Sequence, residues 1–178
     1  MFQRILVAID GSATANRGLK AAFELARDEH ASVDILHVVD GAAMVPYMSD
    51  TGYIPGDYLD RFVEEAREKG RKVLAKAEKQ AGELAIKARG VLVETAGTSV
   101  AQVILEQARK LRSDVIVLGT HGRRGLRRIV MGSDAEAVLR EAKVPVLLVR
   151  APEPSSRPVR ASGTATKPRK RASTKASK

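Results

Sequence analysis

Short, strongly apolar segments alternate along the chain with longer segments in which apolar residues recur every three or four positions. Residues 4–9 are apolar at almost every position, which is typical of a strand buried on both faces of a sheet. In residues 14–29 the apolar side chains fall on one helical face, as in a helix that packs on such a sheet. This alternation predicts βαβ units and therefore a parallel sheet.

The same pattern continues to position 149. We expect further strands at residues 33–39, 91–95, 114–118 and 146–149, and further helices at residues 57–84, 100–111 and 135–142. Gly70 weakens the long helix without necessarily ending it, and the Gly- and Pro-rich residues 40–56 are expected to form a loop. Right-handed crossovers place helices on both faces of the sheet. The prediction is a doubly wound, Rossmann-like α/β fold with a five-stranded parallel sheet in the order 3-2-1-4-5.

The formal net charge of +10 is concentrated in the last part of the 178-residue sequence. Residues 151–178 hold eight Lys or Arg and one acid, a net charge of +7, and they show no periodic apolar face. Residues 1–150 hold 23 basic and 20 acidic residues, and they are numerous enough to bury a core. We therefore predict a folded domain over residues 1–150 and a disordered basic tail over residues 151–178.

The absence of Cys excludes disulfides, thiolate catalysis and Cys-ligated metal sites. No apolar run approaches the roughly 20 residues of a transmembrane helix. The run Ile5–Ile9 is too short for the apolar region of a signal peptide. We expect a cytoplasmic protein without a transmembrane segment.

A Gly-rich segment follows the predicted strand at residues 114–118 and continues to the start of the next helix. Open α/β sheets bind ligands at the carboxyl ends of their strands, where Gly119 and Gly122 let the backbone approach a ligand and adopt positive φ. Ser133 suits an N-cap, and the first N–H groups of its helix would point toward an anion bound beside these glycines. The segment therefore predicts a phosphate site formed by backbone N–H groups. The alternative is that the glycines only turn the chain and Ser133 only caps, since the spacing matches neither standard phosphate motif.

Four arginines, Arg123, Arg124, Arg127 and Arg128, lie between the two glycine clusters. A planar guanidinium group can donate two hydrogen bonds at once to a phosphate, which makes arginine well suited to phosphate binding. Arginines on loops are also commonly solvated, so we expect one or two of the four to contact a ligand.

Three motifs stand out in the sequence: the spacing Gly119-x2-Gly122-x9-Gly132-Ser133, residues 5–12 (Ile-Leu-Val-Ala-Ile-Asp-Gly-Ser) and residues 36–39 (Leu-His-Val-Val). Together they resemble the motifs of the universal stress protein family. The similarity covers residues 1–150 in the same element order, and in that family the glycine spacing marks the branch that binds ATP. The resemblance therefore implies an adenine-nucleotide site for ATP, with Mg²⁺ or Mn²⁺ as an optional companion of the phosphates.

The resemblance also assigns residues to this nucleotide site. The adenosine would contact Ala8, Asp10 and the backbone at Val38. The ribose and phosphates would be surrounded by Gly119, Thr120, His121, Gly122, Arg123, Arg124 and Gly125, and the phosphates would meet Gly132, Ser133 and Asp134 at the helix start.

Two of these positions depart from the family pattern. Ala8 stands where ATP-binding members often have Pro, a mild change because both side chains are small. Asp134 places a carboxylate close to the phosphates, and its repulsion would weaken ATP binding unless a divalent cation intervenes.

No set of nucleophile, base and orienting group is evident, so we assign no catalytic residue. His121 has no evident partner, and a structural role for it is the simpler interpretation. For Asp10, three roles stay open: orienting the ribose, binding a metal through water, or capping the first helix with Ser12. The resemblance implies at most slow or partner-dependent hydrolysis of ATP.

The last predicted strand is strongly apolar and is expected at an edge of the sheet, where unpaired backbone groups attract another strand. Covering it with a second copy of the chain is the simplest solution, and the resemblance implies a homodimer through this strand. The interface would use Val144, Val146, Leu147, Leu148 and Val149.

Two functions follow from these observations. The first is an ATP-binding stress-response or signalling protein that acts as a homodimer. The alternative is a nucleic-acid-associated protein whose dimeric domain carries basic tails. The tail has no aromatic residue for base stacking, so such binding would be independent of sequence and sensitive to salt. A solubilising tail without a partner is an equally good interpretation of the same residues.

Overall fold

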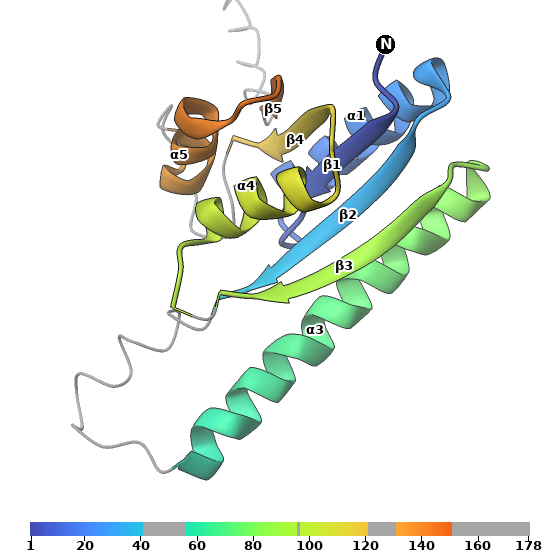
Figure 1. Ribbon diagram of the computed structural model, residues 1–178. Helices are drawn as coiled ribbons and strands as arrows, with labels where there is room; N and C mark the ends of the chain where they lie inside the picture. Colours follow the sequence, from blue (N-terminus) through green and yellow to red (C-terminus); the bar gives the residue numbers. More distant parts are fainter. Residues whose placement is uncertain (41–55, 96, 121–130, 151–178) are drawn as a thin grey trace, which may run out of the picture.

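The computed structural model describes residues 1–40, 56–95, 97–120 and 131–150, with the backbone alone for residues 56–59. Within this part the strands form one parallel sheet: β1 (Arg4–Ala8), β2 (Ser32–Val39), β3 (Ala88–Glu94), β4 (Val115–Gly119) and β5 (Val146–Val149). Their order is β3-β2-β1-β4-β5, which confirms the predicted fold (Figure 1). The predicted loop over residues 41–55 and the predicted tail over residues 151–178 lie outside the described residues.

Helices cover both faces of the sheet (Figure 1). They are α1 (Ala13–Glu29), α3 (Gly56–Glu83), α4 (Val100–Lys110) and α5 (Ser133–Glu141). The helices α1 and α3 share one core cluster with Ile5 and Val7 of β1, whereas α4 and α5 share a second cluster with Leu6. Successive side chains of a strand point to opposite faces, so a strand covered on both sides must be apolar throughout.

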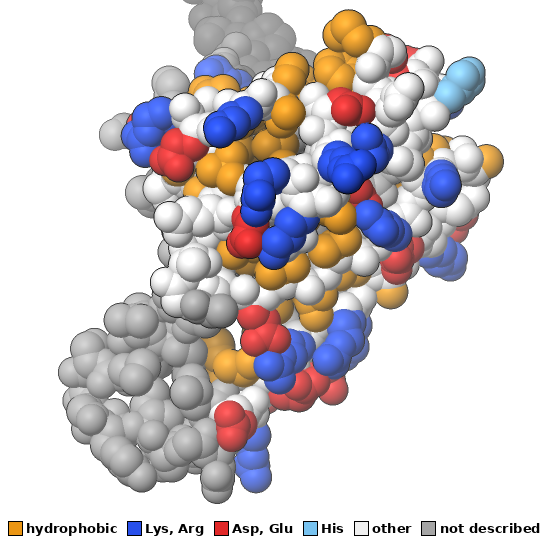
Figure 2. All heavy atoms as spheres, in the orientation of Figure 1, with side chains coloured by type: hydrophobic (Ala, Val, Ile, Leu, Met, Phe, Trp, Pro, Cys, Tyr) orange, Lys and Arg blue, Asp and Glu red, His pale blue; other side chains and the backbone are white. Residues whose placement is uncertain are grey.

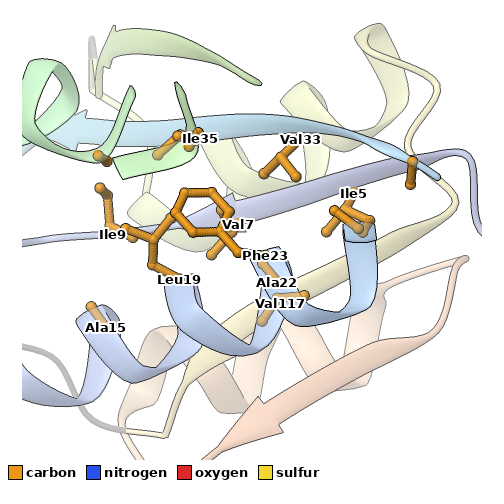
Figure 3. Packing of buried hydrophobic residues seen from close by; sticks show 14 of the residues in the cluster. Ile5, Val7, Ile9, Ala15, Leu19, Ala22, Phe23, Val33, Ile35 and Val117 are labelled. Atoms are coloured by element: carbon orange, nitrogen blue, oxygen red, sulfur yellow. The ribbon is translucent and has the colours of Figure 1, made fainter. Parts of the chain in front are cut away.

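The core between α1 and the sheet is closely packed. Figure 3 shows Leu19 and Phe23 of α1 lying against Val7 and Val117 of the two central strands. Each of these side chains is at least 97% buried. Burial of one such side chain contributes about 1.5–3 kcal/mol, so this layer fixes the position of α1 over β1 and β4.

The long helix α3 passes through Gly70 without a break, which confirms one helix over this range. A Cβ at Gly70 would lie 2.6 Å from Cδ1 of Leu92 and 2.7 Å from Cδ2 of His37. Glycine therefore costs α3 some helical propensity but lets the helix approach β2 and β3 closely.

One strand begins earlier than predicted. Polar Arg89 and flexible Gly90 interrupt the apolar pattern, yet β3 starts at Ala88 because its backbone pairs with β2 from Val33 onward. The guanidinium of Arg89 is hydrogen-bonded to the buried carboxylate of Asp34, with Nε 2.5 Å from Oδ1. The other predicted element ends lie within one or two residues of the observed ones.

Candidate functional site

The strands β1 and β4 are neighbours at the middle of the sheet, and Val7 is in register with Val117. The chain adds β2 and β3 on one side of this pair and β5 on the other, so the pair is the topological switch point. Loops that leave two such strands diverge and open a crevice at the carboxyl edge. The fold thereby brings together Ala8 and Gly119, the last residues of β1 and β4.

After β1 the chain turns directly into α1. The backbone amide of Ser12 donates to Oδ1 of Asp10 over 2.9 Å, and Gly11 between them has a φ of +82°. The hydroxyl of Ser12 accepts from the amide of Ala15 over 3.1 Å and so caps the helix. Of the roles left open for Asp10, shaping the start of α1 together with Ser12 is therefore observed; its contacts with a ribose or a metal stay predictions.

After β4 the buried Thr120 fixes the chain at two points. Its amide donates to the carbonyl of Val149 over 2.9 Å, which extends the pairing of β4 with β5. Its carbonyl accepts from the amide of Gly132 over 2.9 Å. Thr120 and Gly132, on either side of residues 121–130, therefore lie side by side at the start of α5.

Gly119 is needed for packing. A Cβ at this position would lie 3.0 Å from the backbone carbon of Thr14 and 3.0 Å from the amide nitrogen of Ala15. The prediction that Gly119 adopts a positive φ is wrong, since Gly11 and Gly97 are the glycines with positive φ in the described part of the chain. The close approach of α1 to the end of β4 explains this glycine without a ligand.

The start of α5 lies at the same edge. The prediction that Ser133 is the N-cap is wrong by one residue: Gly132 takes the cap position with a φ of −63° and a ψ of 146°, and Ser133 is the first helical residue. Glycine has no side chain with which to cap the first-turn amides. Ser133 and Asp134, the first two helical residues, are both exposed, whereas Ala135 after them is buried.

Val38 lies near the end of β2 and packs, half-buried, against the cluster of α4 and α5. Its neighbour His37 is only 4% exposed, and its Nδ1 atom lies 2.8 Å from the carbonyl oxygen of Ile9. His37 thus joins β2 to the end of β1 as a structural residue.

Sequence patterns did not reveal an ion-pair network at the end of β3. The guanidinium of Arg67 forms two hydrogen bonds to Glu94, of 2.6 and 3.0 Å, and a third to Glu64 over 3.0 Å. The bond to Arg67 lowers the pKa of Glu94, and bonds to Arg71 and then Arg67 lower the pKa of Glu64. Because Arg67 and Glu94 are far apart in sequence, no local spacing signals this contact between α3 and the carboxyl edge.

The remaining predicted nucleotide contacts fall outside the described residues. They are His121, Gly122, Arg123, Arg124 and Gly125, together with the neighbouring Arg127 and Arg128.

Within the part of the chain that the structure describes, no three His, Asp or Glu side chains are grouped to hold a metal ion, so the optional Mg²⁺ or Mn²⁺ gains no support there. Among the helices of the described residues, none combines the length and apolar character of a membrane span.

The strand β5 forms an edge of the sheet, as predicted. Val144, Val146 and Leu148 pack against the α4 and α5 cluster, and Val149 packs against the other one. Leu147 stands apart because 40% of it is exposed. The predicted interface residues therefore lie on β5 or just before it, and among them Leu147 is the exposed large apolar side chain.

Comparison with known proteins gives a consistent result over the described domain. The model of the universal stress protein family matches residues 1–150. Universal stress protein YxiE of Bacillus subtilis is 37% identical over 154 residues, which cover 84% of this chain and 100% of that protein. A crystal structure of a universal stress protein from Burkholderia pseudomallei has 36% identity and a TM-score of 0.67, covering 84% of this chain and 96% of that one.

More distant solved structures share the fold. A universal stress protein from Archaeoglobus fulgidus in complex with dAMP has 23% identity and a TM-score of 0.59, covering 83% of this chain and 97% of that one. A universal stress protein in complex with cAMP has 21% identity and a TM-score of 0.58, covering 84% of this chain and 97% of that one.

Proposed function

The chain belongs to the universal stress protein family, and we propose that it is an adenine-nucleotide-binding stress-response or signalling protein that acts as a homodimer. The observation that carries the proposal is the start of α5 beside the β1–β4 switch point. Gly132 forms no side-chain cap there, whereas Ser12 and Ser99 cap α1 and α4. Among the described residues, α5 thus begins with first-turn amides that no side chain caps.

Uncapped amides at a helix N-terminus favour an anion, since their partial charges sum to about half a positive charge. The hydrogen bond from Gly132 to Thr120 holds this helix start against the end of β4. A phosphate at Ser133 and Asp134 would therefore lie at the crevice in which open α/β sheets bind ligands. The complexes of related proteins with dAMP and cAMP support an adenine nucleotide as the ligand class.

In this proposal the adenosine lies toward Ala8, Asp10 and Val38, and the phosphates lie toward Thr120 and α5. We propose ATP as the cofactor and assign no catalytic residue, so hydrolysis is at most slow or dependent on a partner. The homodimer would form through β5, the edge strand that exposes Leu147. The similarities do not favour the alternative of a nucleic-acid-associated protein.

Calorimetric titration of the full chain with ATP and AMP tests the proposal. We expect saturable binding of ATP, and its loss in Gly122→Val, which inserts a branched side chain into the glycine-rich segment. Gly82→Ala is the control, because a Cβ at Gly82 contacts nothing within 4 Å and the position lies on α3. Unchanged ATP affinity in Gly122→Val counts against this site, and absence of any nucleotide binding by the wild-type chain overturns the function.

A further inference from the structure

Among the described elements, helices pack closely on only one of the two faces of β3. On that face α3 lies against β2 and β3, and Leu92 joins its core cluster. On the other face α4 lies over β2 but reaches little of β3 (Figure 1). Val91 and Val93 turn toward this second face, pack against the cluster of α4 and α5, and are only half-buried. This second side of β3, next to α4, is the open face of the sheet.

The open face interrupts a regular layer. Parallel sheets in α/β domains carry helices on both faces, because their strands are apolar throughout. Here the layer of α5 and α4 stops before β3, although Val91 and Val93 still present apolar side chains there. Leu105 of α4, half-buried in the same cluster, adds to this apolar area. Figure 2 shows hydrophobic side chains between Lys and Arg on the side of the molecule that carries α4 and β3. A further helix placed beside α4 would complete the layer.

Arginines border the open face at the amino-terminal edge of the sheet. On β3, Arg89 lies two residues before Val91 and therefore points to the same side. On β1, Arg4 lies two residues before Leu6, which belongs to the cluster of that side. The helix α4 ends at this edge, because the amide of Asp114 after it donates to the carbonyl of Arg4 over 2.8 Å. With the two arginines at or just after the end of α4, this arginine edge consists of four exposed residues: Arg4, Arg89, Arg109 and Arg112.

Carboxylates near the arginine edge are already engaged. Asp34 is buried and accepts a hydrogen bond from Arg89 over 2.5 Å. Asp114 is half-buried, and its Oδ2 accepts two backbone amides at the start of β1. Glu106 forms an ion pair of 2.8 Å with Lys110. The side chain of Arg89 is nevertheless 65% exposed, so a ligand that approaches this edge meets guanidinium groups.

The chemistry of this surface fits carboxylates carried by a protein. A planar guanidinium can donate two hydrogen bonds at once to a carboxylate, and arginine is enriched in protein interfaces where lysine is depleted. The open face and the arginine edge include no aromatic ring on which a base could stack, which favours a protein over nucleic acid. The helix α3, on the opposite side of the sheet, shows a contrasting pattern of exposed lysines: Lys69, Lys72, Lys76 and Lys79.

We propose that the open face binds an acidic, amphipathic helix of a partner protein. The apolar side of that helix packs on Val91, Val93 and Leu105, and its carboxylates bind the arginine edge. It lies on β3 as a helix and does not pair as a strand, because Oε1 of Glu78 accepts the amide of Gly90 at the free edge over 2.6 Å. This surface lies away from the carboxyl ends of the strands, so the inference stands independently of the proposed nucleotide site.

The test uses the full chain and a fluorescein-labelled synthetic peptide of about 20 residues, or roughly 30 Å of helix, with Leu on one face and Glu on the other. The edge variant replaces three exposed arginines: Arg4→Gln, Arg109→Gln and Arg112→Gln. Arg89 is kept, because its loss would deprive the buried Asp34 of this guanidinium. The control variant replaces three exposed lysines of α3: Lys72→Gln, Lys76→Gln and Lys79→Gln. Both variants keep segment 151–178, so peptide bound by that segment leaves them equal.

Fluorescence anisotropy gives the peptide affinity at low and high salt. We expect saturable binding by the wild-type chain at low salt, and about fivefold to thirtyfold weaker binding by the edge variant, since three exposed ion pairs are lost. The control variant should match the wild type within about twofold. High salt should reduce the difference between the wild type and the edge variant. A peptide of the same composition in scrambled order, without an apolar face, should bind less tightly than the amphipathic one.

Equal affinities of the edge and control variants overturn the inference, because net charge or segment 151–178 then explains the binding. A scrambled peptide that binds as tightly as the amphipathic one also overturns it, since the apolar residues of the open face then contribute nothing. Tighter binding of duplex DNA than of the peptide, lost in the edge variant, identifies a nucleic-acid surface and overturns the protein partner. A wild-type chain without saturable peptide binding overturns the inference and leaves the nucleotide site standing.

Discussion

The Nδ1 atom of His37 lies 2.8 Å from the carbonyl oxygen of Ile9, inside the layer between the sheet and α3. A carbonyl oxygen only accepts, so Nδ1 carries the proton in this contact. The opposite edge of the imidazole faces Gly70, where a Cβ would lie 2.7 Å from Cδ2 and 3.2 Å from Nε2 of His37. One buried ring thus joins β2 to the end of β1 and sets how closely α3 approaches.

Two glycines of α3 should therefore respond in opposite directions to the same substitution. Gly70→Ala forces a methyl group against His37 and Leu92, and overpacking of this kind costs about 1–3 kcal/mol. Gly82→Ala meets nothing within 4 Å and should gain about 0.5–1 kcal/mol from helical propensity. Urea denaturation of both variants measures the difference, and equal stabilisation by the two would contradict the close contact at Gly70.

The carboxylate of Asp114 ties the start of β4 to the start of β1, since its Oδ2 accepts the amides of Gln3 and Arg4 over 2.7 and 2.8 Å. These hydrogen bonds, that of Gln3 first, lower the pKa of Asp114 below its usual 3.8. A lowered pKa stabilises the folded state above the unfolded value, and this stabilisation is lost as the pH falls through the folded value.

Asp114→Asn should consequently destabilise the protein by about 0.5–1 kcal/mol at pH 7, a modest amount because water screens a partly exposed carboxylate. The difference between variant and wild type should shrink as the pH is lowered below the usual aspartate value. Urea denaturation at a series of pH values checks this. A difference that stays constant down to pH 3 would show that the charge of Asp114 contributes nothing.

The fold was predictable because burial on both faces makes each central strand apolar throughout, and because the helices are amphipathic. The start of β3 was not, since Arg89 is accommodated there by Asp34, 55 positions away. The N-cap of α5 was predicted one residue too late, at Ser133, because both Ser and Gly suit this position. In the structure Gly132 is the N-cap, and its amide is hydrogen-bonded to Thr120.

The site itself was predictable mainly in its location. The carboxyl ends of β1 and β4 follow from the topology, which sequence periodicity and resemblance supplied. The packing role of Gly119 depends on how close α1 comes to β4, and no local pattern encodes that distance. The contact of Arg67 with Glu94 likewise depends on tertiary structure alone.

The proposed dimer through β5 makes a testable distinction between two exposed leucines. Leu147 on β5 is 40% exposed and Leu139 on α5 is 47% exposed. Leu147→Glu should convert a dimer at micromolar concentration into a monomer, because it places a charge in a strand-to-strand interface. Leu139→Glu serves as the control and should remain dimeric. Sedimentation equilibrium measures both, and a monomeric wild-type chain would overturn the proposed dimer.

Asp134 provides a test of where the phosphates lie. If they meet the first turn of α5, Asp134→Asn removes a repulsion and should tighten ATP binding about two- to fivefold in the presence of a chelator. Glu141→Gln removes the same charge from the last helical residue of α5 and should change nothing. Calorimetry compares the two. An unchanged affinity in Asp134→Asn places the phosphates elsewhere.

A repeat with Mg²⁺ distinguishes the role of a divalent cation. A cation held between Asp134 and the phosphates makes Asp134→Asn bind ATP more weakly than the wild type, which reverses the sign of the effect.

Whether a nucleotide binds at the β1–β4 switch point is tested most sharply by the backbone amide chemical shifts of the isotope-labelled full chain as ATP is added. We expect saturable shifts at Asp10, Thr120 and Ser133, which the fold gathers at the carboxyl ends of β1 and β4. We expect no shifts along the outer face of α3. Saturable shifts confined to other parts of the chain, or no saturable shifts at all, would contradict binding at the switch point.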